Sequence, residues 1–310
     1  MRVLFWGTPD FAVPPLRALI GEAFDVVGVV TQPDRPVGRS RSTLEAPPVK
    51  HVALEEGIPL FQPERPRGDD FIAQIAALEP DISVVVAYGH ILSQQVIDLP
   101  RLGTINIHAS LLPALRGAGP IQASILQGDA ETGVTIMRMV KALDAGPSIL
   151  QVRTPIPDDE TYGELQLRLS EMGAMALIEA LALLSLGEAV ETPQDESKAT
   201  FARKIDRSMT RVNWSADART VAQTIRAFDP KPGAYTGSSH GDVKLFGARL
   251  TPGCAGAPGE VVAVDERGMT VACAGGGGVL VSAVQPAGKR RLAPLEWQRG
   301  RGIAVGERLS

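Results

Sequence analysis

Short apolar runs alternate with amphipathic segments along the first half of the chain. The runs cover residues 2–6 (RVLFW), 25–31 (DVVGVVT), 81–89 (DISVVVAYG), 103–109 (GTINIHA) and 133–139 (GVTIMRM). Each run is typical of a buried strand, and segments such as PPLRALI between them favour helices. Alternating strands and helices predict an α/β fold with a doubly wound, mostly parallel sheet. A long helix is expected from Thr161, which forms a capping box with Glu164, to near Gly187.

The pattern changes after this helix. Residues 188–206 are polar and aperiodic, which predicts an interdomain linker. A helix is expected around residues 216–228, followed by short strands at 243–250, 259–265, 268–274 and 278–285, with the GGGG run as a hairpin turn. We therefore expect one domain over residues 1–187 and a small C-terminal β-barrel, OB-like, over residues 207–310.

Composition fits this two-domain, globular picture. The chain has 310 residues, 44% hydrophobic and 21% charged. Cys254 and Cys273 form neither a metal-ligand spacing nor a disulfide framework, so we expect a reducing, cytoplasmic compartment. The first apolar run lacks the flanks of a signal peptide, and the apolar stretch at 173–187 is too short to span a bilayer. We expect a core helix there, no membrane association and a monomer.

The net charge of −4 is unevenly distributed. Residues 1–197 carry 14 basic and 26 acidic side chains, whereas residues 198–310 carry 17 and 9, a balance of +8. A basic module on an acidic protein indicates a polyanion partner, because phosphate contacts supply most nucleic-acid affinity. A chance imbalance of solvated surface charge is the alternative interpretation.

Candidate chemistry lies in the stretch TINIHASLLPALRGAGP, residues 104–120. Side chains alternate along a strand, so Asn106 and His108 share one face at its carboxyl end, where open α/β sheets bind ligands. An amide and an imidazole can stabilise an oxyanion and move a proton. Neither a G-x-G-x-x-G nor a phosphate-loop lysine accompanies the predicted strands, so nucleotide cofactors are disfavoured.

Asp144 lies in the loop KALDAGP just after a further predicted strand. If this strand neighbours that of His108, the carboxylate can fix the imidazole. Pro120 is suited to begin a helix at its first position. The structural alternatives are a buried histidine bonded to backbone, an asparagine that caps the strand end and an aspartate that only forms a turn.

The segments GTPDF, TQPDRPVGR, VVVAYG, NIHASLLPALRGAGPIQ, GVTIMRM and LDAGP resemble the methionyl-tRNA formyltransferases in order and spacing. The C-terminal QPAGKRRLAPLEWQRGRGIAVGERL resembles that family's second domain, so the likeness covers nearly the whole chain. The NxHxSLLPxxRG motif with a downstream LDxG is typical of folate-dependent formyltransferases generally. The basic loop and the C-terminal barrel narrow the resemblance to the tRNA enzymes.

The resemblance implies formyl transfer from 10-formyltetrahydrofolate to the α-amine of initiator methionyl-tRNA, without a metal. It implies a catalytic set of Asn106, His108 and Asp144. It implies that the folate site is lined by Ala87, Tyr88, Gly89, Ser110, Leu111, Leu112 and Pro113. It places Arg39 and Arg41 against the tRNA, and the basic run Lys289, Arg290 and Arg291 is expected to bind tRNA as well.

Other functions stay open at this point. The same motif serves formyltransferases that act on glycinamide ribonucleotide or sugar amines, and hydrolases of formyltetrahydrofolate. The basic barrel favours the tRNA substrate, because small amines do not require it. A non-catalytic RNA-binding protein on this scaffold is disfavoured, because all three catalytic side chains are present.

Overall fold

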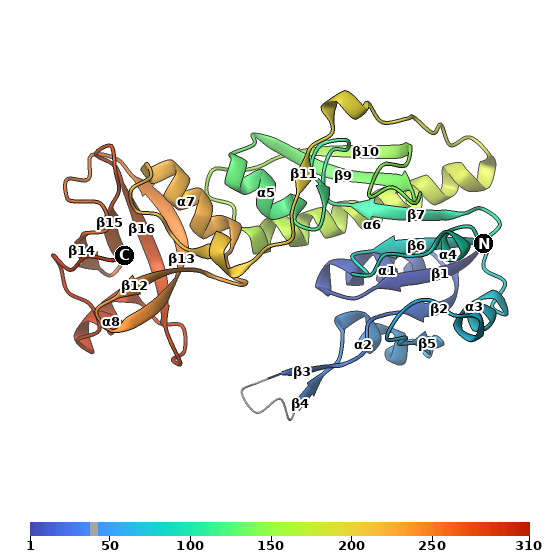
Figure 1. Cartoon of the computed structure of the whole chain (residues 1–310), viewed down its shortest axis with the longest axis horizontal. Helices are drawn as coiled ribbons and strands as arrows, with labels where there is room; N and C mark the ends of the chain where they lie inside the picture. The colour runs from blue at the N-terminus through green and yellow to red at the C-terminus, as the bar shows by residue number, and fades with distance from the viewer. Residues whose placement is uncertain (38–42) are drawn as a thin grey trace. The chain divides into compact units, whose positions relative to one another are not determined.

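The computed structural model of the chain describes residues 1–37 and 43–310. These residues form two compact units (Figure 1). The first unit contains Met1–Gly117, Thr132–Thr154 and Gln166–Ala202, and the second contains Ala118–Glu131, Pro155–Leu165 and Arg203–Ser310. The second unit therefore includes two stretches, residues 118–131 and 155–165, of the domain expected over residues 1–187. The functional division expected at residues 187 and 207 stays a prediction.

Within the described residues, the first unit is built on a seven-stranded sheet ordered β10-β9-β7-β6-β1-β2-β5. Neighbouring strands from β5 to β7 are parallel, and β9 is antiparallel to β7, so the expectation of a mostly parallel sheet is confirmed. The strands are β1 (Arg2–Gly7), β2 (Asp25–Val30), β5 (Leu60–Phe61), β6 (Ile82–Val86), β7 (Thr104–His108), β9 (Glu131–Arg138) and β10 (Ser148–Pro155).

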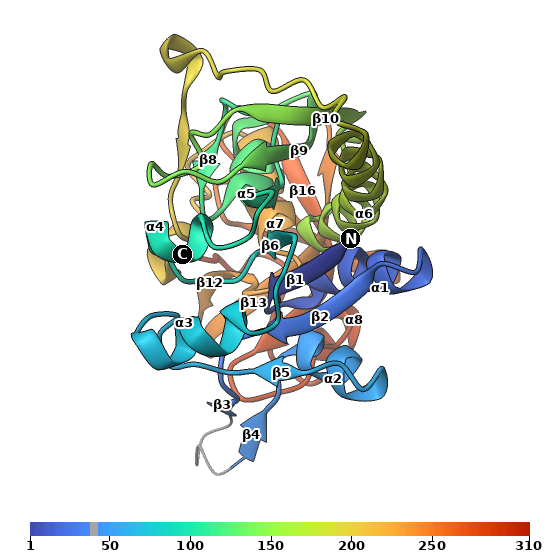
Figure 2. The ribbon, with the colours of Figure 1, turned by 90° about the vertical axis from the view of Figure 1, so that its right-hand side faces the viewer.

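Helices cover both faces of this sheet, which confirms the doubly wound arrangement. Figure 2 shows α1, α2 and α6 on one side of the strands and α3 and α4 on the other. The helices are α1 (Val13–Gly21), α2 (Pro48–Glu55), α3 (Asp69–Ala76), α4 (Gln94–Ile97) and α6 (Tyr162–Leu186). Leu4 and Trp6 of β1 pack with residues of α3 and α4, because alternate side chains of a strand face the same side.

Helix α6 begins at the expected capping box. Glu164 accepts a hydrogen bond from the Thr161 backbone N–H at 2.9 Å, and Thr161 Oγ1 accepts from the Glu164 N–H at 3.4 Å. The helix is long and apolar enough to cross a membrane by length and composition. Its side chains Leu169, Leu177 and Leu181 are fully buried within the protein, so the expected core helix is confirmed.

Two short strand pairs lie outside the main sheets of the described residues. β3 (Arg35–Val37) pairs with β4 (Thr43–Glu45) in antiparallel. β8 (Arg116–Gly117) pairs with β11 (Phe201–Ala202) in parallel. This second pair lies within the first unit and joins the expected linker to the stretch that follows β7.

The second unit contains a five-stranded antiparallel sheet ordered β12-β13-β16-β15-β14, all within residues that the structure describes. Leu309 donates to the carbonyl of Gly259 beside β14, and Ser310 exchanges two hydrogen bonds with Gly237 of β12, so the two sheet edges are bridged. The GGGG run connects β15 to β16, as expected. The strands are β12 (Ala234–Ser238), β13 (Gly241–Thr251), β14 (Val261–Asp265), β15 (Gly268–Ala272) and β16 (Gly278–Pro286).

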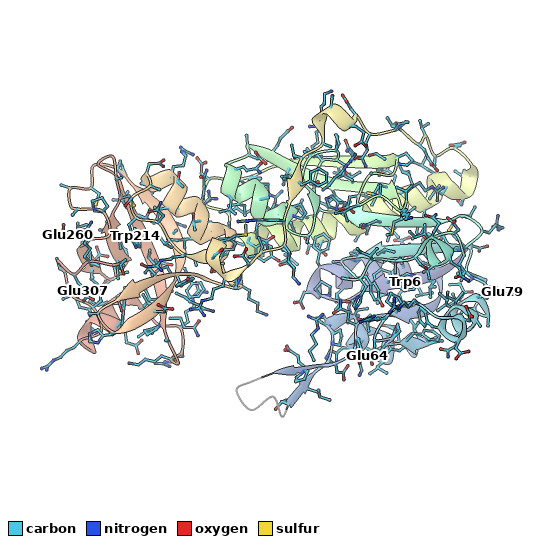
Figure 3. All side chains as sticks on the ribbon, viewed as in Figure 1. Trp6, Glu64, Glu79, Trp214, Glu260 and Glu307 are labelled. Carbon is cyan, nitrogen blue, oxygen red and sulfur yellow. The ribbon has the colours of Figure 1, made fainter. Side chains whose placement is uncertain are left out.

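Helices α7 (Ala218–Ala227) and α8 (Pro294–Arg299) close the core of this barrel. Trp214, labelled in Figure 3, is buried in that core, and its indole N–H donates to Thr236 Oγ1 at 2.9 Å. Helix α5 (Pro120–Gln127) also belongs to the second unit. It starts at Pro120 as expected and ends at Gly128 in the left-handed conformation that favours glycine.

Candidate active site

Asn106 and His108 lie at the carboxyl end of β7, on the face predicted from the alternation of the strand. The His108 ring is buried, with 6% of its side chain exposed, whereas Asn106 is half-buried. His108 Nε2 lies 3.0 Å from the carbonyl oxygen of Leu115. A carbonyl oxygen only accepts, so Nε2 carries the hydrogen of this bond. The side-chain amide of Asn106 forms no hydrogen bond with any described residue, so its two N–H donors are available to a ligand.

Asp144 follows β9 and faces His108. Its Oδ2 lies 3.8 Å from His108 Nδ1 and accepts a hydrogen bond from the Gly117 N–H at 2.8 Å. The two strands are adjacent, with His108 opposite Thr135. Asp144 has φ +48°, a left-handed conformation that is uncommon for residues other than glycine. The structure therefore brings together the three side chains that the sequence singled out.

The SLLP turn is held in place by hydrogen bonds from its own residues and from β9 and β10. Ser110 Oγ donates to the Ala114 carbonyl at 2.6 Å, and the Leu112 N–H donates to Thr135 Oγ1 at 3.1 Å. Gln151 donates to the Leu112 carbonyl at 2.7 Å. Ser110 and Leu112 are buried, while Leu111 and Pro113 are partly exposed. The turn is thus a fixed wall with part of its apolar surface accessible.

A second wall candidate follows β6. Ala87 and Gly89 are exposed with φ values of +47° and +88°. Between them, the Tyr88 carbonyl accepts hydrogen bonds from Thr8 Oγ1 and Gln32 Nε2, both at 2.9 Å. The Tyr88 ring is buried edge-to-face against Trp6, which Figure 3 labels, and burial raises the pKa of its hydroxyl to about 12. The segment therefore presents backbone and small side chains to solvent from a rigid base.

Arg116 is a buried cation beside the site that the sequence reasoning did not assign. The residue is 3% exposed. Its guanidinium donates hydrogen bonds to Gln194 Oε1 at 2.8 Å and to Glu196 Oε1 at 2.7 Å. The hydrogen bonds that Arg116 donates to Glu196 lower the pKa of Glu196 and raise the pKa of Arg116. Gln194 and Glu196 are about 80 residues away from Arg116 in sequence. The only signal for this contact in the sequence was therefore an arginine within an otherwise apolar stretch.

The expected tRNA contacts have different surroundings. Arg39 and Arg41 lie outside the described residues. Lys289 is exposed, and Arg290 is exposed with Glu296 at 3.1 Å. Arg291 stacks over Phe246, 4.0 Å from the ring centroid, so its side chain also has a packing role within the second unit. Across the described residues, no three His, Cys, Asp or Glu side chains gather in a way that would hold a metal ion.

Comparisons with known proteins match both parts of the chain. Residues 1–181 match the family described as formyl transferase, and residues 204–302 match the formyl transferase C-terminal domain. A methionyl-tRNA formyltransferase of Moorella thermoacetica is 44% identical over 99% of this chain and 98% of its own length. One from Pseudomonas putida is 47% identical over 88% of this chain and 87% of its own length.

Solved structures share the fold at lower identity. HypX from Aquifex aeolicus in complex with tetrahydrofolic acid is 20% identical, with a TM-score of 0.66, over 96% of this chain and 46% of that one. An N-formyltransferase from Helicobacter canadensis, in complex with folinic acid and dTDP-3-aminofucose, is 18% identical, with a TM-score of 0.65, over 90% of this chain and 98% of that one. At these identities the likeness concerns the fold alone.

Proposed function

The chain belongs to the methionyl-tRNA formyltransferase family, and from this premise we propose that it transfers the formyl group of 10-formyltetrahydrofolate to the α-amine of initiator methionyl-tRNA. The observation that carries the assignment of the site is the convergence of Asn106, His108 and Asp144 at the carboxyl end of β7, which Asp144 reaches from the loop after the antiparallel strand β9. The folate supplies an activated formyl carbon on N10. The available amide of Asn106 and the fixed SLLP wall fit a flat donor whose formyl oxygen must be bound.

The reaction forms a bond between the amine nitrogen and the formyl carbon and breaks the bond from that carbon to N10. The amine loses a proton, and N10 gains one. Negative charge develops on the formyl oxygen in between, so donors fixed beside it lower the barrier. Asn106 donates its amide N–H to this oxygen. His108 donates its Nε2–H to the same oxygen. In the free protein this N–H donates to the Leu115 carbonyl, and it turns to the formyl oxygen when the substrate is bound.

Asp144 supports His108 in this scheme. Its carboxylate, 3.8 Å from Nδ1, orients the ring and relays protons directly or through water. The same oxygen, Oδ2, accepts the hydrogen bond from the Gly117 N–H, which holds it beside the ring. Removal of an oxyanion donor typically costs ~10²–10³ in rate.

The tRNA is held by basic side chains on two segments. We assign Arg39 and Arg41 to the acceptor end and Lys289 and Arg290 to the phosphate backbone, in keeping with the +8 charge of residues 198–310. Replacement of either pair by alanine raises KM for tRNA and leaves folate binding unchanged. Arg17→Ala is the matched control, because this exposed arginine on α1 pairs with Glu55. A normal KM in both double variants contradicts this assignment.

Substitutions test the basic module more cleanly than truncation. The second unit includes residues 118–131 and 155–165, which a C-terminal deletion would leave without their partners. The affinity of the full chain for tRNA falls with salt at a log–log slope of roughly −0.7 to −0.9 per phosphate neutralised. The Lys289→Ala, Arg290→Ala double variant flattens this slope. An unchanged slope places the RNA contact elsewhere.

One assay separates this function from its alternatives. Purified protein, 10-formyltetrahydrofolate and either methionyl-tRNA or a nucleotide-linked sugar amine are incubated, and formyl-methionine, formyl-sugar and free formate are quantified. The proposed function gives formyl-methionine attached to tRNA. Formyl-sugar or formate as the main product would assign the site to a sugar formyltransferase or a hydrolase.

A further inference from the structure

The stretch expected to be an interdomain linker contains an ordered strap over the candidate catalytic loops. Residues 194–202, called the strap below, include a 3-10 turn at Glu196–Lys198 and strand β11. They belong to the first unit, and β11 pairs in parallel with β8 directly after the SLLP turn. Two strap side chains, those of Gln194 and Thr200, reach the backbone that holds His108 and Asp144.

Thr200 fixes the carbonyl on which His108 rests. Its Oγ1 accepts a hydrogen bond from the Leu115 N–H at 2.8 Å, and its N–H donates to the Pro113 carbonyl at 3.3 Å. Leu115 has φ +60°, a conformation that leucine rarely adopts and that its surroundings must impose. Because the Leu115 carbonyl accepts from His108 Nε2 at 3.0 Å, Thr200 determines where the imidazole lies.

Gln194 performs the corresponding task for Asp144. Its Nε2 donates to the carbonyls of Asp144 at 2.8 Å and Gly146 at 2.7 Å, so both amide hydrogens are used on this loop. Its Oε1 accepts from the buried Arg116 guanidinium at 2.8 Å. The amide thus joins the Asp144 loop, whose φ of +48° also has to be imposed, to a cation anchored by the same strap through Glu196.

We propose that Gln194 and Thr200 are positioning residues that set the mutual placement of His108 and Asp144, an inference that rests on the proposed function for its kinetic consequences. Neither side chain contacts a reacting atom. Each holds a backbone segment in a left-handed conformation and thereby fixes the carbonyl or carboxylate that faces the imidazole. Loss of either contact lets these segments relax and misplaces the proton donor.

The kinetic test removes each hydrogen bond while it keeps the volume of the side chain. Thr200→Val deletes the hydroxyl acceptor and keeps the shape, and Thr200→Ser restores it. Gln194→Met deletes both amide donors and keeps the stem. Displacements of this kind cost about 10- to 100-fold in kcat, while KM for either substrate stays within about twofold. Ser197→Ala is the control and should leave kcat unchanged, because among the described residues the Ser197 hydroxyl bonds only to Asp195, within the strap.

A spectroscopic readout tests the positioning without any substrate. The chain has four histidines, His51, His90, His108 and His240, so the ring 15N signals of His108 are assigned from their loss in His108→Gln. Wild-type protein should show His108 as the Nε2–H tautomer at pH 8. Thr200→Val and Gln194→Met should shift these signals, Thr200→Ser should restore them, and the other three histidines should not change.

The outcomes separate the inference from the proposed function. Shifted His108 signals in both variants support the positioning role, whatever the substrate. If wild-type protein does not formylate methionyl-tRNA, that failure overturns only the proposed function. Unchanged His108 signals with normal kcat in folded variants overturn the inference. The two substitutions act at opposite ends of the strap, so if one variant fails to fold, the other decides in the same way.

Discussion

Gly146→Ala should displace Asp144 and thereby impair formyl transfer, because the Asp144 loop has no room for a methyl group at this position. A Cβ built on Gly146 would lie 1.9 Å from the carbonyl oxygen of Arg138, and real Cβ atoms essentially never approach other heavy atoms within 3.0 Å. The backbone must therefore move by about 1 Å, and Asp144 is only two residues away. A shift of this size in a catalytic group costs roughly 10²-fold in rate.

The assay is steady-state formylation of methionyl-tRNA, with urea unfolding of the same preparations as a check of folding. We expect Gly146→Ala to lose kcat by about two orders of magnitude with KM for tRNA unchanged, and to lose stability by about 1–3 kcal/mol from overpacking. Gly21→Ala is the matched control, because no other part of the described chain, beyond the adjacent residues and the backbone of its own helix, lies within 4 Å of its Cβ position. A Gly146→Ala enzyme with kcat within threefold of wild type refutes the claim that this loop holds Asp144 rigidly.

Three further predictions concern stability, each followed by urea unfolding. Leu309→Ala, which empties a core position 2% exposed, should destabilise the barrel by about 2–5 kcal/mol, and a loss below about 1 would disprove edge closure by this segment. Burial raises the pKa of Asp229 despite the bond from the Gly247 N–H, so its ionisation opposes folding as pH rises; Asp229→Asn should be more stable than wild type at pH 7, with the gain lost toward pH 4. Thr161→Ala should cost about 1 kcal/mol at neutral pH, and less on acidification below the ordinary Glu164 pKa of 4.5, because bonds from Thr161 lower that pKa.

Local sequence signals were sufficient to predict the elements that depend on residues close to one another in the sequence. The continuous apolar run of β1 reflects burial on both faces of a parallel sheet. The Thr161–Glu164 capping box marked the start of α6 because its hydrogen bonds join residues three apart. The alternation around Asn106 and His108 predicted their shared face, and adjacency of β7 and β9 brought Asp144 within reach.

Contacts between distant segments were not predictable in the same way. The strap was expected to be a linker because its polar, aperiodic residues have no internal pattern, yet Gln194 and Thr200 bond to backbone about 50 and 85 residues away. The left-handed Leu115 that receives His108 Nε2–H also has no sequence signal, since leucine rarely adopts that conformation. Strand β10 was not recognised because its positions are half-buried without clear alternation.

The central claim is that His108, supported by Asp144 and acting with Asn106, stabilises the charge on the formyl oxygen during transfer to methionyl-tRNA. The most direct measurement is the single-turnover rate of methionyl-tRNA formylation by His108→Ala, with both substrates saturating and their dissociation constants measured separately. The account predicts a rate lower by about 10²–10³ with both dissociation constants unchanged. A near-normal rate in His108→Ala would contradict it.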